Sequence, residues 1–344
     1  MSRLIATLIA WLALTLVSPA ATLEQFGGGT AIVDNSPAWT QAMASFPSHG
    51  GLLELGCGSY RTSNPLVISS YVEVSGCGGE GTTVIDCAGI VALSPCISSS
   101  GYGLRINGIL IKAPSGPGIA VSNSAFAEIE DVGVVDSRAT DAAVWSHTCI
   151  TIHNVWEIKM EDIRLVNCRT FSLSVSGYNT TLDVKRLYGD HPAKSCIMVN
   201  GLTYAHFDTP ACDSPGDYAY WLRNSGAVTF TSPGAEYAAK GMFLFTASTA
   251  EGASATVKDV RGVVIEAPFS FGNGYSQPYY SSLIEAASLN GRPIDITVIG
   301  GMEHTSPNTL SMLLSGAGVR VSRIGGTWKG RVTVSGGAVF ANLF

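Results

Sequence analysis

Apolar and polar residues alternate along short segments that recur through most of the chain, about every 20 to 40 residues. A period of two is typical of a β-strand with one buried face. Gly, Pro, Ser and Asn gather between these segments, where they favour turns. Few stretches have the period of a helix. The predicted strands are residues 71–76, 103–111, 127–135, 158–166, 181–188, 203–208, 227–232, 255–265, 294–301 and 319–326.

This recurrence favours a solenoid, in which each coil of the chain stacks on the coil before it. Equivalent strands of successive coils would then be parallel neighbours about 4.8 Å apart. A β-sandwich is the alternative, but its strands are expected every 8–12 residues or so and alternate in direction. The spacing therefore predicts an all-β parallel β-helix.

One segment near the start of the chain has a helical pattern instead. Residues 34–46 place Ala38, Ala42, Met43 and Phe46 on one helical face, and Pro37 stands at the first helical position. Asp34, Asn35 and Ser36 are suitable capping residues before it. Because a solenoid needs its open end covered, we expect this helix to cap the first coil.

Eight cysteines lie beyond residue 20, and an even number in an exported chain favours disulfides. The segments LLELGCG and VEVSGCG are near repeats, so Cys57 and Cys77 are expected at the same place in successive coils, within reach of a bond. Buried free thiols are the alternative. The same logic pairs Cys149 with Cys168 and Cys196 with Cys212 between coils, and Cys87 with Cys96 within a loop.

The first twenty residues, MSRLIATLIAWLALTLVSPA, have the features of a secretory signal peptide. Arg3 precedes an apolar run that is short for a bilayer span, and Ser18 and Ala20 are suitably small for cleavage. An uncleaved anchor is the alternative. We expect a secreted or periplasmic protein without stable membrane insertion, with residues 21–344 forming one β-helix domain.

The composition narrows the partners. The formal net charge is −6, only 13% of residues are charged, and Lys and Arg form no cluster along the sequence. Phosphate binding needs such clusters, so nucleic acid is not an expected partner. No spacing of His, Cys, Asp or Glu indicates a metal site or a cofactor. The sequence does not predict the oligomeric state.

One pattern in residues 25–86 consists of Phe26, Gly27, Asp34, Asn35, Ser36, Trp39 to Ala44, Gly50, Gly51, Gly58, Ser59, Tyr60, Ser63, Pro65, Leu66, Gly76, Gly78, Thr83 and Ile85. With these residues the segment resembles the entry region of the pectate-lyase-like, right-handed parallel β-helix superfamily. This group includes polygalacturonase-like hydrolases, rhamnogalacturonase-like and epimerase-like proteins, and tailspike depolymerases. The resemblance implies a single-stranded right-handed parallel β-helix and a polysaccharide as partner.

The chain departs from this superfamily where chemistry is concerned. The usual Gly-Asp-Gly turn is replaced by GGGTAIVDN, and the Asn-Thr-Asp and Gly-His-Gly signatures of polygalacturonase-like hydrolases are absent. The arginine signature of pectate lyases is not found either. No catalytic residue of these families is therefore carried over.

Acidic residues follow several predicted strands at a similar distance, as a stack of carboxylates along one edge would require. Stacked carboxylates could supply the acid and base of a glycosidase. Solvated turn residues are the alternative. Asp190 and Glu303 come first because His191 and His304, which could bind substrate, follow them. The stack would contain Asp136, Asp190, Glu236, Glu266 and Glu303, and the last four are the catalytic candidates.

A second predicted column consists of arginines: Arg164, Arg186, Arg261 and Arg323. Arg186 and Arg261 are the candidates for substrate binding, because polysaccharide lyases need cations to neutralise a uronate carboxylate. Ion pairing with nearby acids is the alternative for these arginines.

The longest interruption of the repeat, residues 269–283, is rich in aromatic residues. Tyr275, Tyr279 and Tyr280 are candidates for stacking on sugar rings, and a loop folded onto the coils is the alternative. Among the tryptophans, Trp145, Trp156, Trp221 and Trp328 could line a groove or belong to the core.

The sequence thus favours an exported carbohydrate-active protein, either a glycoside hydrolase or a polysaccharide lyase. A polysaccharide-binding adhesin or tailspike-like receptor-binding protein without catalysis is the main alternative. A surface scaffold is a third.

Overall fold

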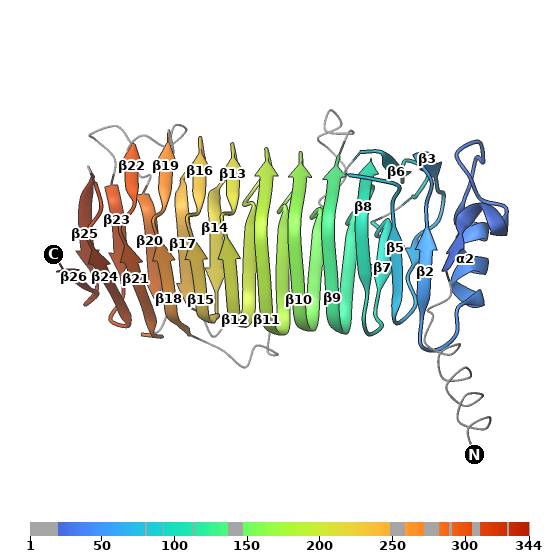
Figure 1. The fold of residues 1–344 in the computed structure, drawn as a ribbon. Helices are drawn as coiled ribbons and strands as arrows, with labels where there is room; N and C mark the ends of the chain where they lie inside the picture. Colours follow the sequence, from blue (N-terminus) through green and yellow to red (C-terminus); the bar gives the residue numbers. More distant parts are fainter. Residues whose placement is uncertain are drawn as a thin grey trace, which may run out of the picture.

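The computed structural model describes residues 20–343, apart from residues 80, 92, 113, 137–146, 248–258, 272–281, 289–290, 305–309 and 329. The described chain is an elongated parallel β-helix whose strands run across its long axis (Figure 1). The β-helix prediction is confirmed. The predicted signal peptide lies almost wholly outside the described residues, as do Trp145, Tyr275, Tyr279 and Tyr280.

Each coil passes through three faces in the same order. Face 1 contains β4 (Leu66–Val67), β7 (Ile97–Ser99), β14 (Tyr218–Arg223), β17 (Gly241–Ala247), β20 (Ser282–Ser288), β23 (Leu310–Ser315) and β25 (Arg331–Ser335). Face 2 contains β1 (Ala20–Thr22), β2 (Gly51–Glu54), β5 (Val72–Ser75), β15 (Gly226–Thr231), β18 (Val260–Glu266), β21 (Ile294–Ile299), β24 (Val319–Ile324) and β26 (Val339–Leu343). Face 3 contains β3 (Gly58–Arg61), β6 (Thr83–Asp86), β13 (Ala211–Asp213), β16 (Gly234–Glu236), β19 (Phe269–Phe271) and β22 (Met302–His304).

Five longer strands bend around the corners between faces. β9 (Ile119–Val135), β10 (Ile150–Val166) and β11 (Leu173–Asp190) run through all three faces, β8 (Arg105–Lys112) through faces 2 and 3, and β12 (Ile197–Asp208) through faces 1 and 2. The sequence predicted one short strand over residues 127–135 and one over residues 158–166. Both turn from face 2 to face 3, at Asp131 and Asp162, which have φ of 49° and 55°.

Parallel pairing from coil to coil sets the register of every face. On face 2, for example, Glu73 pairs with Arg105, Arg105 with Glu128, and Glu128 with Lys159. All of the strand pairings that the structure describes are parallel, which excludes the β-sandwich. Residues about 20 to 30 positions apart in sequence therefore become vertical neighbours about 4.8 Å apart.

The core follows from the alternation in each strand. Inward positions hold Ile, Val, Leu and Phe side chains that are almost completely buried. In the middle coils Phe207 of β12 stacks on Phe230 of β15 in the next coil, with ring centroids 4.7 Å apart. Such vertical stacks bury the same face of every coil, so each coil is stabilised mainly by its two neighbours.

Helix α2 (Ser36–Ser45) covers the first coil, as predicted (Figure 1). Its residues Trp39, Ala42 and Met43 are buried. The Trp39 indole donates a hydrogen bond of 2.9 Å to the carbonyl of Val67 on face 1. A short 3₁₀ helix, η1 (Leu23–Phe26), precedes it and buries Leu23. None of the helices in the described ranges is long and apolar enough to cross a membrane.

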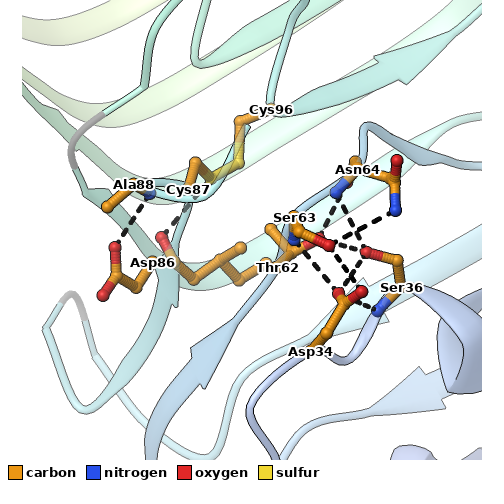
Figure 2. Close-up of a disulfide and its surroundings, with 10 residues drawn as sticks. Asp34, Ser36, Thr62, Ser63, Asn64, Asp86, Cys87, Ala88 and Cys96 are labelled. Atoms are coloured by element: carbon orange, nitrogen blue, oxygen red, sulfur yellow. Dashed lines mark hydrogen bonds between the residues drawn. A yellow bond between two sulfur atoms is a disulfide. The ribbon is translucent and has the colours of Figure 1, made fainter. Parts of the chain in front are cut away.

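The turn before α2 is tied to the first coil by one carboxylate (Figure 2). Asp34 accepts hydrogen bonds from the backbone N–H of Ser36 and of Ser63, each 3.0 Å long, and from both hydroxyls. Burial acts to raise the pKa of Asp34, but these four bonds outweigh it and lower the pKa to about 2. The capping segment is therefore held to β3 and the following turn by a charge.

All four predicted disulfides are present. Cys57 and Cys77 occupy equivalent positions in successive coils, as expected, and Cys87–Cys96 closes the loop between β6 and β7 (Figure 2). The other two differ from the prediction. Cys149 and Cys168 flank β10 and thus join the two ends of one coil, and Cys196–Cys212 likewise lies within one coil because both chain segments turn inward there.

We expect Asp34→Asn to destabilise the protein by about 2 kcal/mol at pH 7, because a hydrogen bond to a charged group contributes about 1.5–3 kcal/mol. The pKa of Asp34 is lowered in the folded state, so its contribution is complete above pH 4 or so and is lost as the pH falls towards 2. Urea unfolding at pH 7 and at pH 2.5 measures both effects. Asp86→Asn is the matched control, because Asp86 accepts only one such backbone bond, from Ala88; an equal loss in the two variants at pH 7 would contradict the assignment.

The Cys149–Cys168 and Cys57–Cys77 disulfides enclose loops of nearly equal length, with sequence separations of 19 and 20. Chain entropy alone predicts a loss of about 3 kcal/mol for either pair of Cys→Ala substitutions. Cys149 and Cys168 are buried, whereas Cys57 and Cys77 are exposed. Removing Cys149 and Cys168 should therefore lower the free energy of unfolding by about 1 kcal/mol or more beyond the entropic loss, because buried packing is lost as well. Equal midpoints of thermal unfolding for the two double variants would show that this packing is unimportant.

Candidate functional site

Three carboxylates occupy one outward column of face 3 in three successive coils. Asp190 at the end of β11 pairs in register with Asp213 of β13, and Asp213 pairs with Glu236 of β16. Their backbones are therefore about 4.8 Å apart between neighbours and about 10 Å apart from first to last. We call Asp190, Asp213 and Glu236 the carboxylate ladder.

Like charges directly opposite each other on neighbouring strands destabilise a sheet. One outward column of face 2 avoids this cost by alternating in sign: Arg105 lies 3.2 Å from Glu128, and Lys159 lies 3.0 Å from Glu128. In the next outward column Glu130 pairs in register with Glu161, but Lys159 forms an ion pair with each of these carboxylates. Hydrogen bonds to Glu130 and Glu128 raise the pKa of Lys159 above its usual range. Face 2 thus has the character of a solvated, charge-paired surface, whereas the carboxylate ladder concentrates negative charge.

Tyr188 and Arg164 lie beside the ladder on face 3. Tyr188 stands two residues before Asp190, and Arg164 pairs with it in register on the preceding coil. Burial raises the pKa of Tyr188, the negative charges of Asp190, Asp213 and Glu236 add to the effect, and Arg164 opposes it. The Tyr188 hydroxyl therefore remains protonated at neutral pH and can donate a hydrogen bond to a bound molecule.

The members of the ladder differ in their own contacts. The Asp190 carboxylate is in contact with Nδ1 of His191, an exposed residue, so these two residues of the sequence analysis do lie together. Asp213 accepts a hydrogen bond of 2.8 Å from the hydroxyl of Ser214. Glu236 is exposed. Two of the three carboxylates thus have a neighbouring hydrogen-bonding group that can orient them.

An aromatic pair lies directly after Glu236. Phe271 of β19 pairs in register with Glu236, and its ring meets the edge of Tyr237 with centroids 5.5 Å apart. Residues 272–281, which include Tyr275, Tyr279 and Tyr280, follow Phe271 in the sequence but lie outside the described residues. The ladder is therefore continued by aromatic surface on the next coil.

The other predicted members of the acidic stack lie elsewhere. Asp136 is one position out of register and buried, with Oδ2 2.8 Å from Nε of Arg169 and 3.4 Å from Nε2 of His147. Glu266 belongs to face 2, where it pairs with Thr231. A single five-member stack is therefore wrong, because strands that look alike in sequence belong to different faces.

Glu303 and His304 are placed only by register. Glu303 pairs with Ser270, so it is one position away from the ladder's column, and His304 pairs with Phe271. Their side chains lie outside the described residues.

Asp213 was missed by the sequence analysis. Its strand, β13, has only three residues and therefore shows almost no alternation. The signal that could have found it is the spacing of Asp190, Asp213 and Glu236, which stand 23 residues apart.

The predicted arginine column does not exist. Arg164 lies on face 3, Arg186 at the corner between faces 2 and 3, Arg261 at the corner between faces 1 and 2, and Arg323 on face 2. Arg186 binds Asp162 at 2.6 Å and Glu161 at 2.7 Å, and Arg261 lies 3.0 Å from Asp259. The ion-pair alternative accounts for both substrate-binding candidates.

The tryptophans also differ among themselves. Trp156 is 59% exposed and belongs to no core, Trp221 is half-buried and donates to the hydroxyl of Thr246, and Trp328 packs partly against the core. No group of three or more His, Cys, Asp or Glu residues in the described part of the chain is placed to hold a metal ion.

No protein-family model and no curated protein matches the sequence. Solved structures do match. A tailspike, gp42 of Acinetobacter phage vb_AbaP_AS12, superposes with a TM-score of 0.71 at 10% identity, over 94% of this chain and 62% of its own. The thermostable GH87 α-1,3-glucanase of Streptomyces thermodiastaticus strain HF3-3 has a TM-score of 0.64 at 14% identity, over 94% and 68%.

A third match is PfbA, a surface adhesin of Streptococcus pneumoniae, with a TM-score of 0.57 at 11% identity over 94% of this chain and 90% of that one. The chain thus spans less than two thirds of the tailspike. At these identities the likeness concerns the fold alone. Together with the parallel register described above, it establishes that this chain has a single-stranded right-handed parallel β-helix fold.

Proposed function

We propose that this protein is an exported glycoside hydrolase that cleaves a polysaccharide at the carboxylate ladder. The observation that carries the proposal is the run of like charges Asp190, Asp213 and Glu236 in one column of neighbouring coils, in contrast to the alternating charges of Arg105, Glu128 and Lys159 on face 2. The fold is also found in a glucanase, a tailspike and a surface adhesin, which supports a carbohydrate as the partner.

Glycoside hydrolysis needs two carboxyl groups across the scissile bond. One protonates the leaving oxygen, and the other attacks the sugar or activates water. The carboxyl groups are about 5–5.5 Å apart in retaining enzymes and about 6.5–9.5 Å apart in inverting ones. Neighbouring coils supply a spacing near the first value, so we assign the reaction to the neighbours Asp213 and Glu236.

Within this pair, Glu236 is the proton donor and Asp213 the nucleophile. Glu236 is exposed and adjoins the aromatic surface of Phe271 and Tyr237, against which a sugar ring can stack. Asp213 is held by the Ser214 hydroxyl, which fixes a nucleophile in place. Glu236 protonates the glycosidic oxygen as Asp213 attacks the anomeric carbon, and water then releases the sugar from Asp213. Tyr188 donates a hydrogen bond to the substrate beside them.

A lyase mechanism has less support. Abstraction of a proton next to a uronate carboxylate requires cations that neutralise it. Arg186 and Arg261 already bind acidic side chains of the protein, and the ladder itself would repel a polyuronate. Arg164, which pairs in register with Tyr188, is a single cation beside the three carboxylates.

Binding without catalysis is the second candidate, and the exposed aromatic side chains elsewhere on the coils favour it. The two candidates differ in what they predict for an assay of polysaccharide cleavage. A pure binding protein retains a polysaccharide and releases no product from it.

Export is proposed from two observations. The described chain contains four disulfides, which persist in oxidising compartments. The first twenty residues have the features of a secretory signal peptide, with the small residues Ser18 and Ala20 suited to cleavage. The mature N-terminus, determined on the secreted protein, is expected within a few residues of Ala21.

Glu236→Gln and Asp213→Asn should each lower kcat on the cleaved polysaccharide by about 10²-fold or more, since general acid catalysis contributes about 10²–10⁴-fold. Release of reducing ends from a polysaccharide panel measures the rate. Glu266→Gln is the matched control, because Glu266 is also the last residue of its strand, β18, but lies on face 2. Unchanged activity in Glu236→Gln, or an equal loss in Glu266→Gln, would exclude the assignment.

The stereochemistry of the first product tests the pairing separately. Asp213 and Glu236 on neighbouring coils predict retention of the anomeric configuration, which NMR of the fresh product detects. Inversion would instead assign the reaction to Asp190 and Glu236, two coils apart. Formation of unsaturated uronates, seen by ultraviolet absorbance, would show a lyase and refute the hydrolase.

A further inference from the structure

Exposed aromatic side chains gather at the corner between faces 1 and 2, away from the carboxylate ladder. The most exposed are Tyr204 at 67%, Trp156 at 59% and Phe126 at 58%. The set, which we call the aromatic corner, comprises Tyr71, Tyr102, Phe126, Trp156, Tyr178 and Tyr204.

Register places Tyr71, Phe126 and Tyr204 in one vertical row and Tyr102 and Trp156 in a second. Tyr102 bridges to Ala125, which pairs with Trp156, so the two rings stand two coils apart. Tyr71 and Phe126 are also two coils apart, with Gly103 between them, and Tyr204 lies three coils beyond Phe126. The rings therefore follow the long axis over about 25 Å. Within each row, neighbouring rings are about 10 Å or more apart.

The backbone at this corner is unsuited to aromatic residues. Tyr71, Phe126 and Tyr204 have φ of 61°, 61° and 60°, in the left-handed region that disfavours bulky side chains. Two equivalent positions in other coils are glycines, Gly103 and Gly262. Three aromatic residues thus occupy strained positions and remain exposed, so neither backbone preference nor core packing explains them. Strain of this kind is characteristic of functional sites.

The glycine at one position serves a neighbouring ring. A Cβ placed on Gly103 would come within 2.7 Å of Cδ1 of Tyr71, so the Tyr71 ring lies over this glycine. It helps to line a hollow of about 500 Å³ together with Phe126, Glu73 and Arg105. Gly103 therefore provides a flat seat for an exposed aromatic ring.

A second hollow, of about 380 Å³, is lined by Tyr102, Asn123, Ser124, Asn154, Trp156 and Tyr178. None of these six side chains is charged. The Asn154 amide donates to Oδ1 of Asn123 at 3.1 Å and accepts from the backbone N–H of Tyr178 at 2.8 Å. Rings and amides thus alternate at the surface, which gives stacking faces next to hydrogen-bonding groups.

This chemistry fits a neutral polysaccharide. A pyranose ring has an apolar C–H face that stacks on an aromatic ring, and its hydroxyl groups bond to amides. The second hollow has no cationic side chain for a uronate or a sulfate, and Arg105 in the first hollow already pairs with Glu73 and Glu128. The linear arrangement suits a chain of sugars.

We propose that the aromatic corner binds a neutral polysaccharide chain lying along the axis of the β-helix, as a site separate from the carboxylate ladder. The proposal does not require the ladder to be catalytic. It assigns the strained aromatic residues to stacking and the Asn123–Asn154 pair to hydrogen bonds with sugar hydroxyls.

The test uses the triple variant Tyr71→Gly/Phe126→Gly/Tyr204→Gly. Glycine relieves the backbone strain while removing the rings, so the midpoint of thermal unfolding should stay the same or rise. Affinity electrophoresis is run with laminarin, dextran, xyloglucan and galactomannan as neutral chains and with polygalacturonate and alginate as anionic ones. The full-length protein should be retarded by at least one neutral chain, and the triple variant should bind it at least 10-fold more weakly. Trp156→Ala should weaken the same binding.

Thr181→Gly/Ala227→Gly is the matched control, because Thr181 and Ala227 have the same left-handed backbone in the same row without a ring, with φ of 58° and 53°. It should leave binding unchanged. Failure of every neutral chain to retard the protein, stronger retardation by the anionic chains, or equal affinity in the triple variant would each overturn the proposal.

The outcome is distinguishable from that of the hydrolase proposal. Binding is measured with Glu236→Gln, so that the polysaccharide is not consumed, and hydrolysis with the protein carrying an intact ladder. Binding that depends on the aromatic corner, with no product from any polysaccharide, supports the corner and refutes the hydrolase. Hydrolysis without such binding does the reverse.

Discussion

Coil-to-coil hydrogen bonding between parallel strands is the interaction on which the rest of this structure depends. It fixes the register of all three faces, so that a side chain in one coil always meets its equivalents in the coils before and after. The fixed register stacks the core aromatics Phe207 and Phe230, and it also stacks whatever stands outside. A residue type that is repeated in successive coils therefore forms a ladder. Repeated aromatic residues stack favourably in the core, whereas repeated charges of one sign repel each other.

The outward ladders differ in how they manage charge. On face 2, Arg105, Glu128 and Lys159 alternate in sign and pair, so that face gains modest stability and little chemistry. On face 3, Asp190, Asp213 and Glu236 repeat the same sign, which costs stability in a position where neutral residues would serve the fold equally well. The aromatic corner shows the same relation in backbone terms, because Phe126 and Tyr204 occupy positions that elsewhere hold glycine. This local cost without local benefit is the reason for proposing both surfaces as ligand sites.

The two surfaces divide the coil between them. Substrate chemistry is assigned to the end of face 3, where carboxylates meet the aromatic pair Tyr237 and Phe271, and chain binding to the corner between faces 1 and 2. A polysaccharide is long enough to engage both. A protein that holds a chain at one corner raises the effective concentration of its other segments at the second site.

By itself the sequence determined the fold class, the capping helix and the four cysteine pairs, because alternation, capping residues and near-identical repeats such as LLELGCG and VEVSGCG are local signals. Tertiary structure alone decided which face each strand joins. A single left-handed residue at a corner, such as Asp162 or Arg186, changes the face without interrupting the alternation, so Glu266 and Asp190 look equivalent in sequence and lie on different faces. The same ambiguity hid Asp213 and the exposure of Trp156, since both depend on register between coils, which no single segment contains.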